Sequence, residues 1–174
     1  MKQLINLEEI AISLPTDYGD IPLEGAENID VAKVSNINSE GRFHKSFEKR
    51  TFPIKKLSKL LVKEGELLVV KSSGSKTNIL SGKTAFCDNS VAGKLIASNF
   101  LIRLSIDESK AYPKYIWYVL NSKFSKKFIR KIVGATTYPN LKWSTYKTHP
   151  IPLPPLDEQR RIAKELDLSI KMRN

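Results

Sequence analysis

Cysteine, histidine and long apolar runs are scarce in this 174-residue sequence, and each scarcity excludes a class of protein. The one cysteine, Cys87, cannot form an internal disulfide and supplies no cluster of metal ligands. The two histidines, His44 and His149, lack the partner pattern of a catalytic triad or a zinc site. No apolar run approaches the ~18 residues of a membrane span, and Glu8 and Glu9 come too early for a signal peptide. We therefore expect a cytoplasmic protein with no metal, no other cofactor and no membrane partner.

Acidic residues are also outnumbered. The chain has 29 lysines and arginines against 18 aspartates and glutamates, a formal net charge of +11. A surplus of this size favours a polyanionic partner, because cations that neutralise phosphates release condensed counterions. A basic surface that is only solvated is the alternative. With 41% hydrophobic residues, the length fits one soluble domain with a short appendage.

Catalytic motifs are absent or misspaced. Gly74–Thr84 imitates a P-loop, but seven residues separate its glycines where the motif needs four, and strand-like residues follow Thr84. Asp88, Glu108 and Lys110 imitate the acidic pattern of metal-dependent nucleases, yet a polar surface loop explains them. Neither the methyltransferase Pro-Pro-aromatic signature nor a dinucleotide-binding glycine loop occurs. The chain is therefore predicted to bind rather than to catalyse.

The first two thirds of the sequence are predicted to be rich in strands. Residues 4–14 favour an opening helix or strand, and residues 57–62 favour a short helix that Gly65 closes. Alternating or continuous apolar residues predict strands at residues 30–37, 67–70, 83–87 and 100–104.

The middle of the chain changes to helical periodicity. Pro113 suits the first turn of a helix that continues to Leu120, and Asn121-Ser122 can cap a second helix over residues 123–133. On that second helix five cations share one face: Lys123, Lys126, Lys127, Arg130 and Lys131. Apolar residues share another: Phe124, Phe128, Ile129 and Ile132. Phosphate contact and a solvated outer face are both open interpretations of the basic face.

The C-terminal part has the clearest pattern. Three prolines within residues 151–156 exclude a helix interior and a central strand. Asp157 can then cap a helix that runs to the end of the chain. Its apolar stripe is formed by Ile162, Ala163, Leu166 and Ile170. Such a helix serves as a connector or pairs with another helix; the alternative is that it folds back on its own domain.

Residues 151–163, Ile-Pro-Leu-Pro-Pro-Leu-Asp-Glu-Gln-Arg-Arg-Ile-Ala, resemble the signature at which the target-recognition domain of a type I restriction–modification specificity subunit passes into a conserved spacer helix. Weaker matches occur in the expected order, at residues 31–37, 64–69 with 73–75, 112–115 with 120–122, and 134–137 with 140–141. Glu66 replaces the family's usual aspartate. The resemblance spans nearly the whole chain.

The resemblance implies an α+β fold, a twisted and mostly antiparallel sheet with flanking helices, followed by a C-terminal helix. It implies a DNA target-recognition domain at residues 1–156 and the start of a spacer or dimerisation helix at residues 157–174. As a non-catalytic specificity subunit, the protein would direct methyltransferase subunits, and through them a restriction subunit, to one half of a bipartite DNA target, in a system of DNA methylation and phage defence. The family usually has two such domains. This chain is therefore a fragment or a half-subunit that pairs with a second copy, and both remain open.

Polar loops flanked by regular structure are the candidates for DNA contact: Ser35–Asn38, Lys71–Asn78 and Thr136–Trp143. Phosphate contacts would fix register while loop side chains reach base edges in the major groove. The favoured residues are Asn36, Lys71, Ser73, Lys76, Asn78, Thr136, Thr137, Tyr138 and Lys142. Turn chemistry is the alternative for each, because loops are generally built from such residues.

Two rival functions are retained. A basic RNA-binding module would need aromatics exposed on a sheet for base stacking, whereas most aromatics here fall in the helical middle: Tyr115, Trp117, Tyr118, Phe124 and Phe128. The second rival is an anti-restriction protein that mimics a specificity subunit and blocks assembly.

Overall fold

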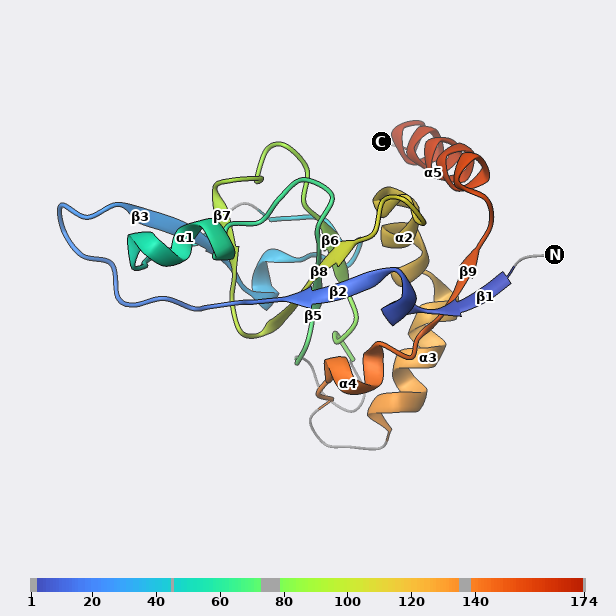
Figure 1. The fold of residues 1–174 in the computed structure, drawn as a ribbon, viewed down its shortest axis with the longest axis horizontal. Coiled ribbons are helices and arrows are strands. Elements are labelled where there is room, and N and C mark those ends of the chain that lie inside the picture. Colours follow the sequence, from blue (N-terminus) through green and yellow to red (C-terminus); the bar gives the residue numbers. More distant parts are fainter. Residues whose placement is uncertain (1–2, 45, 73–78, 135–138, 174) are drawn as a thin grey trace.

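The structure is a computed structural model that describes residues 3–44, 46–72, 79–134 and 139–173. It has a mixed α and β fold built around three small sheets (Figure 1). The strands are β1 (Gln3–Asn6), β2 (Ala11–Leu14), β3 (Asn28–Ala32), β4 (Glu48–Thr51), β5 (Leu67–Val70), β6 (Thr84–Phe86), β7 (Leu95–Ala97), β8 (Leu101–Ile106) and β9 (Pro150–Leu153). The α-helices are α1 (Ile54–Leu60), α2 (Pro113–Leu120), α3 (Lys123–Val133), α4 (Trp143–Tyr146) and α5 (Leu156–Lys171).

The central sheet has the order β2-β8-β5-β6, with antiparallel pairing throughout. Strand β5 pairs on both sides, since Leu67 lies opposite Leu104 of β8 and Phe86 of β6. All four residues of β5 are buried, which explains why its sequence is continuously apolar rather than alternating. Leu67 and Val69 join one hydrophobic cluster, and the other two residues of β5 join a second on the opposite face.

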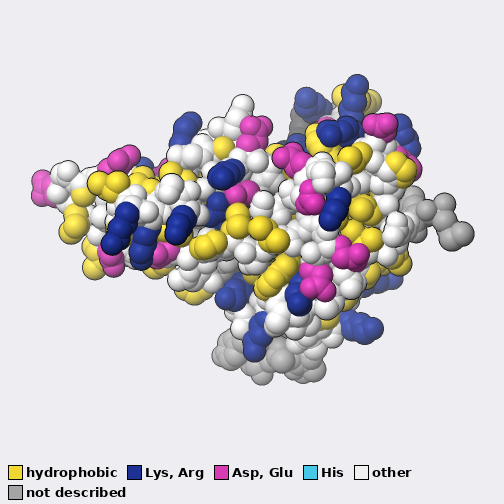
Figure 2. Space-filling model, in the orientation of Figure 1, with side chains coloured by type: hydrophobic (Ala, Val, Ile, Leu, Met, Phe, Trp, Pro, Cys, Tyr) yellow, Lys and Arg dark blue, Asp and Glu magenta, His cyan; other side chains and the backbone are white. Residues whose placement is uncertain are grey.

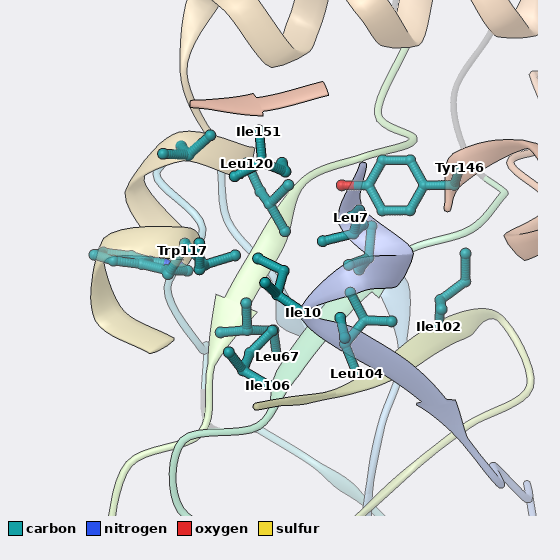
Figure 3. Packing of buried hydrophobic residues seen from close by; sticks show 14 of the residues in the cluster. Leu7, Ile10, Leu67, Ile102, Leu104, Ile106, Trp117, Leu120, Tyr146 and Ile151 are labelled. Atoms are coloured by element: carbon teal, nitrogen blue, oxygen red, sulfur yellow. The ribbon is translucent and has the colours of Figure 1, made fainter. Parts of the chain in front are cut away.

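Helices α2 and α3 cover the first of these faces. Figure 3 shows Leu67 and Leu104 from the sheet packed with Leu120 from α2 and with residues from the two ends of the chain. Trp117 of α2 is buried and its Nε1 donates to the Thr84 carbonyl oxygen at 2.8 Å. This bond fixes α2 to β6. The predicted helices at residues 113–120 and 123–133 are both confirmed.

The second sheet, β4-β3-β7, contains the one parallel pair among the described strands, β3 with β7. The predicted strand at residues 30–37 is right only for its first part. After Ala32 the chain enters a 3₁₀ turn at Val34–Asn36. Strands β4 and β7 were not predicted, because β4 is the charged tetrapeptide Glu-Lys-Arg-Thr and β7 is only three residues long.

The third sheet joins the two ends of the described chain, because β1 pairs with β9 (Figure 1). Pro152 lies opposite Leu4, and Pro150 opposite Asn6. Prolines are tolerated here because a two-stranded sheet has a free edge on each strand. The exclusion of a central strand at residues 151–156 therefore agrees with the structure.

Two predicted end signals are wrong. Helix α1 ends at Leu60, where Leu61 turns to an extended conformation, so Gly65 does not close it. Gly65 has a φ of +86° and forms the turn that precedes β5. Asp157 is not the cap of α5, which begins one residue earlier, after Pro155. Asp157 lies in the first turn of the helix, where a carboxylate interacts favourably with the helix dipole.

Arg103 of β8 connects the central sheet to α1. Its side chain is buried beside the carboxylate of Glu66, with bonds of 2.7 Å from Nε and 2.9 Å from Nη2. The same guanidinium donates to the carbonyl oxygens of Lys59, Leu60 and Leu61 at 2.7, 3.2 and 3.0 Å. These carbonyls at the end of α1 have no partner within the helix. Arg103 therefore both neutralises a buried carboxylate and caps a helix.

Candidate nucleic-acid interface

Two of the predicted DNA-contacting loops leave the sheet side by side. The backbone N–H of Leu141 donates to the Lys71 carbonyl oxygen at 2.7 Å, and Ser72 forms an isolated antiparallel bridge with Asn140. The Ser81 hydroxyl donates to the Pro139 carbonyl oxygen at 3.0 Å. The segments that follow β5 and precede α4 are thus tied together at their bases. The described ends of both segments lie beside α4 in the lower part of Figure 1.

The described loop candidates other than Asn36 are Lys71 and Lys142. Lys71 is half-buried directly after β5, and Lys142 is exposed directly before α4. The other loop candidates lie outside the described residues: Ser73, Lys76, Asn78, Thr136, Thr137 and Tyr138. Contact of any of these residues with DNA stays a prediction.

Asn36 has a structural role in its turn. Its side chain is only 2% exposed. Its Oδ1 accepts from the Lys33 backbone N–H at 2.9 Å, and its Nδ2 donates to the carbonyl oxygens of His44 and Ser46, each at 3.1 Å. Both donors and the acceptor of the amide are therefore used. A base edge would have to displace these bonds, so the structure favours the turn-chemistry alternative for Asn36.

Helix α3 presents an uncompensated basic face. Its five cations are all exposed, and none has a carboxylate within 4 Å among the described residues: Lys123, Lys126, Lys127, Arg130 and Lys131. Buried Ile129 and Val133 hold the opposite face on the core, and Ser122 caps the helix by accepting from the Ser125 N–H at 3.3 Å. The predicted apolar face is correct for Ile129, whereas Phe124 is 46% exposed.

Some cations elsewhere are paired with acids. On the β3–β4 side Glu48 pairs with Lys33 and, at 2.8 Å, with Arg50, while Asp30 pairs with Lys49 at 2.8 Å. Figure 2 shows a group of Lys and Arg side chains over α1 with acidic side chains among them, and further cations at the lower edge of the molecule. Part of the positive charge on the β3–β4 side is therefore neutralised by neighbouring carboxylates.

His149 packs against α3. It is fully buried, with its Nε2 2.7 Å from the Ser125 hydroxyl and its Nδ1 2.8 Å from the Pro150 carbonyl oxygen. Burial lowers the pKa of His149 to about 4, against an opposing effect of the Pro150 carbonyl, which favours the charged form. The imidazole is thus neutral near pH 7, and its contacts are those of a packing residue.

Phe100 is a surface residue that sequence reasoning missed. Its ring is 51% exposed, and its carbonyl oxygen accepts from the Lys71 N–H at 3.0 Å, at the base of the first loop. The ring packs edge-on against Tyr18 with centroids 6.1 Å apart. The sequence predicted Phe100 to be part of a strand, because an apolar run follows it. The exposure of its ring could not be predicted from that pattern.

The C-terminal helix packs on α2 along one face. Gln159 is fully buried: its Oε1 accepts from the Tyr112 N–H at 2.8 Å and its Nε2 donates to the Pro154 carbonyl oxygen at 2.7 Å. Ala163 is 1% exposed, so it is used within the domain. Ile162 and Ile170 are half-buried. This face of α5 therefore packs on its own domain, as the alternative interpretation of the helix predicted.

Parts of α5 remain open. Leu166, on the same stripe as Ile162 and Ile170, is 39% exposed, and Leu168 and Met172 on the other side are 51% and 88% exposed. Of the four predicted interface residues, Leu166 is the one left most accessible. In the described part of the chain, no helix is long and apolar enough to span a bilayer. No group of three or more His, Cys, Asp or Glu side chains that could hold a metal occurs among the same residues.

The described residues thus form a mixed α and β domain in which two polar segments converge near the basic helix α3. Residues 15–172 match the family model described as the type I restriction modification DNA specificity domain, and the chain belongs to this family. This match confirms the predicted target-recognition domain, a specificity module rather than an enzyme.

Known proteins agree with this assignment. The chain is similar to the type I restriction enzyme MjaIX specificity subunit of Methanocaldococcus jannaschii, with 29% identity over 52% of this chain and 21% of that protein. The HsdS subunit from Thermoanaerobacter tengcongensis has a TM-score of 0.70 at 21% identity. A chain from a structure of type I R-M complex assembly and conformational transition has a TM-score of 0.73 at 20% identity. Each alignment covers 98% of this chain and 42% of the solved chain, which confirms the predicted fold class.

Proposed function

We propose that this chain reads one half of a bipartite DNA target as the recognition domain of a cytoplasmic type I specificity subunit. Through that subunit it directs methyltransferase subunits, and with them a restriction subunit, to the target. The observation that supports this proposal is the convergence of the segments at Lys71 and Leu141 beside the basic helix α3. One end of the domain thereby gathers polar loops and positive charge.

In the proposed mechanism, phosphate contacts fix the register of the domain and loop side chains read base edges. Lys71 and Lys142 stand at the bases of the two loops, where a lysine can reach a phosphate or the guanine edge. Phe100 lies beside Lys71 with its ring exposed, and an apolar ring suits contact with a thymine methyl group. Asn36 is left out of this surface because its amide is fully bonded.

Residues 1–156 form the reading domain in this proposal, and residues 157–174 begin the spacer. Figure 1 shows α5 at the upper edge, away from α4 and the converging segments, so both ends can be engaged at once. Exposed apolar side chains lie on two sides of α5, Leu166 on one and Leu168 with Met172 on the other, and either side would pack on a second helix. That helix belongs to a second copy of the chain, to the rest of a longer specificity subunit or to a methyltransferase subunit.

The RNA-binding alternative has less support. Tyr115 and Trp117, two of the aromatics that a base could stack on, are each only 5% exposed. They belong to the core rather than to a stacking platform.

The test is methylome sequencing of cells that express the complete protein containing this chain together with its methyltransferase subunits. A methylated motif that changes when residues 1–156 are exchanged for a related domain is the expected result. Competition between duplex DNA and structured RNA for the purified complex is the second measurement. Preference for RNA, or loss of restriction without any methylated motif, would overturn the proposal in favour of the RNA-binding module or the anti-restriction mimic.

A further inference from the structure

We infer that a hollow between α3 and the turn at residues 79–83 binds a backbone phosphate of the DNA, held by Lys83, Lys126 and Arg130. This inference rests on the proposed function and adds to it the surface that carries affinity rather than sequence discrimination. The loops would then contact the bases, and α3 would contact the phosphate backbone.

The hollow has the size and the lining that a phosphate needs. Its volume is about 300 Å³, roughly ten times the ~30 Å³ that a water molecule occupies in the liquid. Lys126 and Arg130 enter from α3 and Lys83 from the facing turn, while Ser39 adds a hydroxyl group. A phosphate would therefore meet cations from two sides and the Ser39 hydroxyl as a further donor.

Among the described residues, the charges in this hollow have no acidic partner. No aspartate or glutamate is among its described lining residues, and none of the three cations forms an ion pair with another described residue. Like charges gathered in one concavity repel each other and raise the local concentration of anions. Arginine adds a planar fork of donors that matches two phosphate oxygens. An anion is thus the complement of this surface.

The two walls are held at a fixed spacing. Gly82 has a φ of +90°, and a Cβ built on it would lie 2.8 Å from the Ile129 side chain, so the turn lies directly against α3. The Gly82 N–H donates to the Val70 carbonyl oxygen at 2.8 Å, which ties the same turn to β5. Ile129 itself is 4% exposed and anchored in the core. The backbone positions that carry the cations are therefore fixed before the ligand binds, which lowers the cost of binding.

The position of the hollow indicates DNA rather than a free anion. Ser81, in its wall, bonds to Pro139 at the base of the second loop, so a duplex read by that loop passes beside α3. Lys123, Lys127 and Lys131 continue the basic face beyond the hollow. Lys126 and Arg130 lie one helical turn apart, about 6 Å along the axis at 1.5 Å per residue. A row of cations of this kind follows a chain of phosphates.

The test compares two doubly substituted specificity subunits, each assembled with its methyltransferase. Lys126→Gln with Arg130→Gln removes two charges from the hollow. Lys55→Gln with Lys59→Gln is the matched control, because these exposed lysines of α1 have the same four-residue spacing and no ion pair among the described residues. Binding of a fluorescent duplex is measured across a salt series, together with the melting temperature of each protein.

We expect the Lys126/Arg130 variant to bind about ten- to a hundredfold more weakly, the loss of one or two charge-assisted hydrogen bonds. The slope of log K against log salt should fall in magnitude by about 0.9 for each phosphate that the variant no longer neutralises. The methylated motif should stay the same, because phosphate contacts carry no sequence information. The control variant should retain both the affinity and the slope, and both variants should melt like the wild type.

Equal losses in the two variants, or no loss in either, would show that only net charge matters and would overturn the inference. A changed methylated motif would also overturn it, since the hollow would then contact bases. If millimolar inorganic phosphate raises the melting temperature while DNA binding by the variant is unchanged, the hollow binds free phosphate instead. Failure of the unsubstituted complex to bind DNA at all would refute the proposed function itself. That outcome differs from failure of the inference alone, in which the unsubstituted complex binds DNA and the two variants bind it equally well.

Discussion

The buried His149 makes the stability of the domain depend on pH in a direction that can be calculated. Its pKa is about 4 in the folded protein and 6.5 ordinarily. Between these pH values the unfolded chain binds a proton that the folded protein does not. The contribution of His149 to the free energy of unfolding is therefore fully present above about pH 6.5 and is lost as the pH falls toward about 4. The full effect is about 3 kcal/mol, from 1.36 kcal/mol per unit of pKa. At about pH 5, roughly 2 kcal/mol of it would be lost.

Urea unfolding of the wild type and of His149→Gln at about pH 7.5 and pH 5 measures this contribution. Glutamine keeps a donor and an acceptor for Ser125 and the Pro150 carbonyl but does not titrate. Carboxylates titrate in both proteins, so the wild type should lose about 2 kcal/mol more than the variant on acidification. His44→Gln, which removes the exposed histidine, is the control and should lose as much as the wild type. Equal losses in wild type and His149→Gln would refute the reasoning.

Substitutions at Arg103, at Phe100 and on α5 test three other parts of the structure. Replacing Arg103 by methionine leaves the Glu66 carboxylate buried without its partner, so the free energy of unfolding, measured in urea, should fall by about 3–5 kcal/mol. The control is Arg42→Met at an exposed ion pair, which should lower it by less than about 1 kcal/mol. Phe100→Ala should change one position of the methylated motif and leave the melting temperature nearly unchanged, because the ring is half exposed; an unaltered motif would remove Phe100 from the reading surface. Leu166→Asp with Leu168→Asp should prevent self-association or methyltransferase docking in sedimentation, while Lys164→Asp, on an exposed position of the same helix, should not.

Local signals in the sequence predicted the helical part of the fold well. Pro113 and Ser122 mark where α2 and α3 begin, and the spacing of their apolar residues matches the buried faces. The continuous apolar run of β5 likewise reflects its burial on both sides. Strand β4 could not be predicted in this way, because Glu48, Lys49 and Arg50 form a strand through pairing with β3 rather than through intrinsic preference.

The candidate site was harder to predict because it depends on contacts between distant segments. Ser81 and Pro139 are 58 residues apart in the sequence, and no local pattern indicates that they meet. Asn36 shows the converse difficulty. Asparagine is equally suited to a turn and to an adenine edge, and only burial distinguishes the two roles. The basic face of α3 was visible in the sequence, but its lack of acidic partners among the described residues is a property of the folded surface.

The pairing of β1 with β9 has a consequence for how such domains are joined. Strand β9 leads directly into α5, so polypeptide attached before β1 and polypeptide continuing from α5 both extend from the same ribbon. In Figure 1 α5 lies apart from α4 and the converging segments. A neighbouring module can therefore be fused on either side without obstructing the reading surface. The loops could therefore diversify while the connection through the ribbon and α5 to a neighbouring module stays the same.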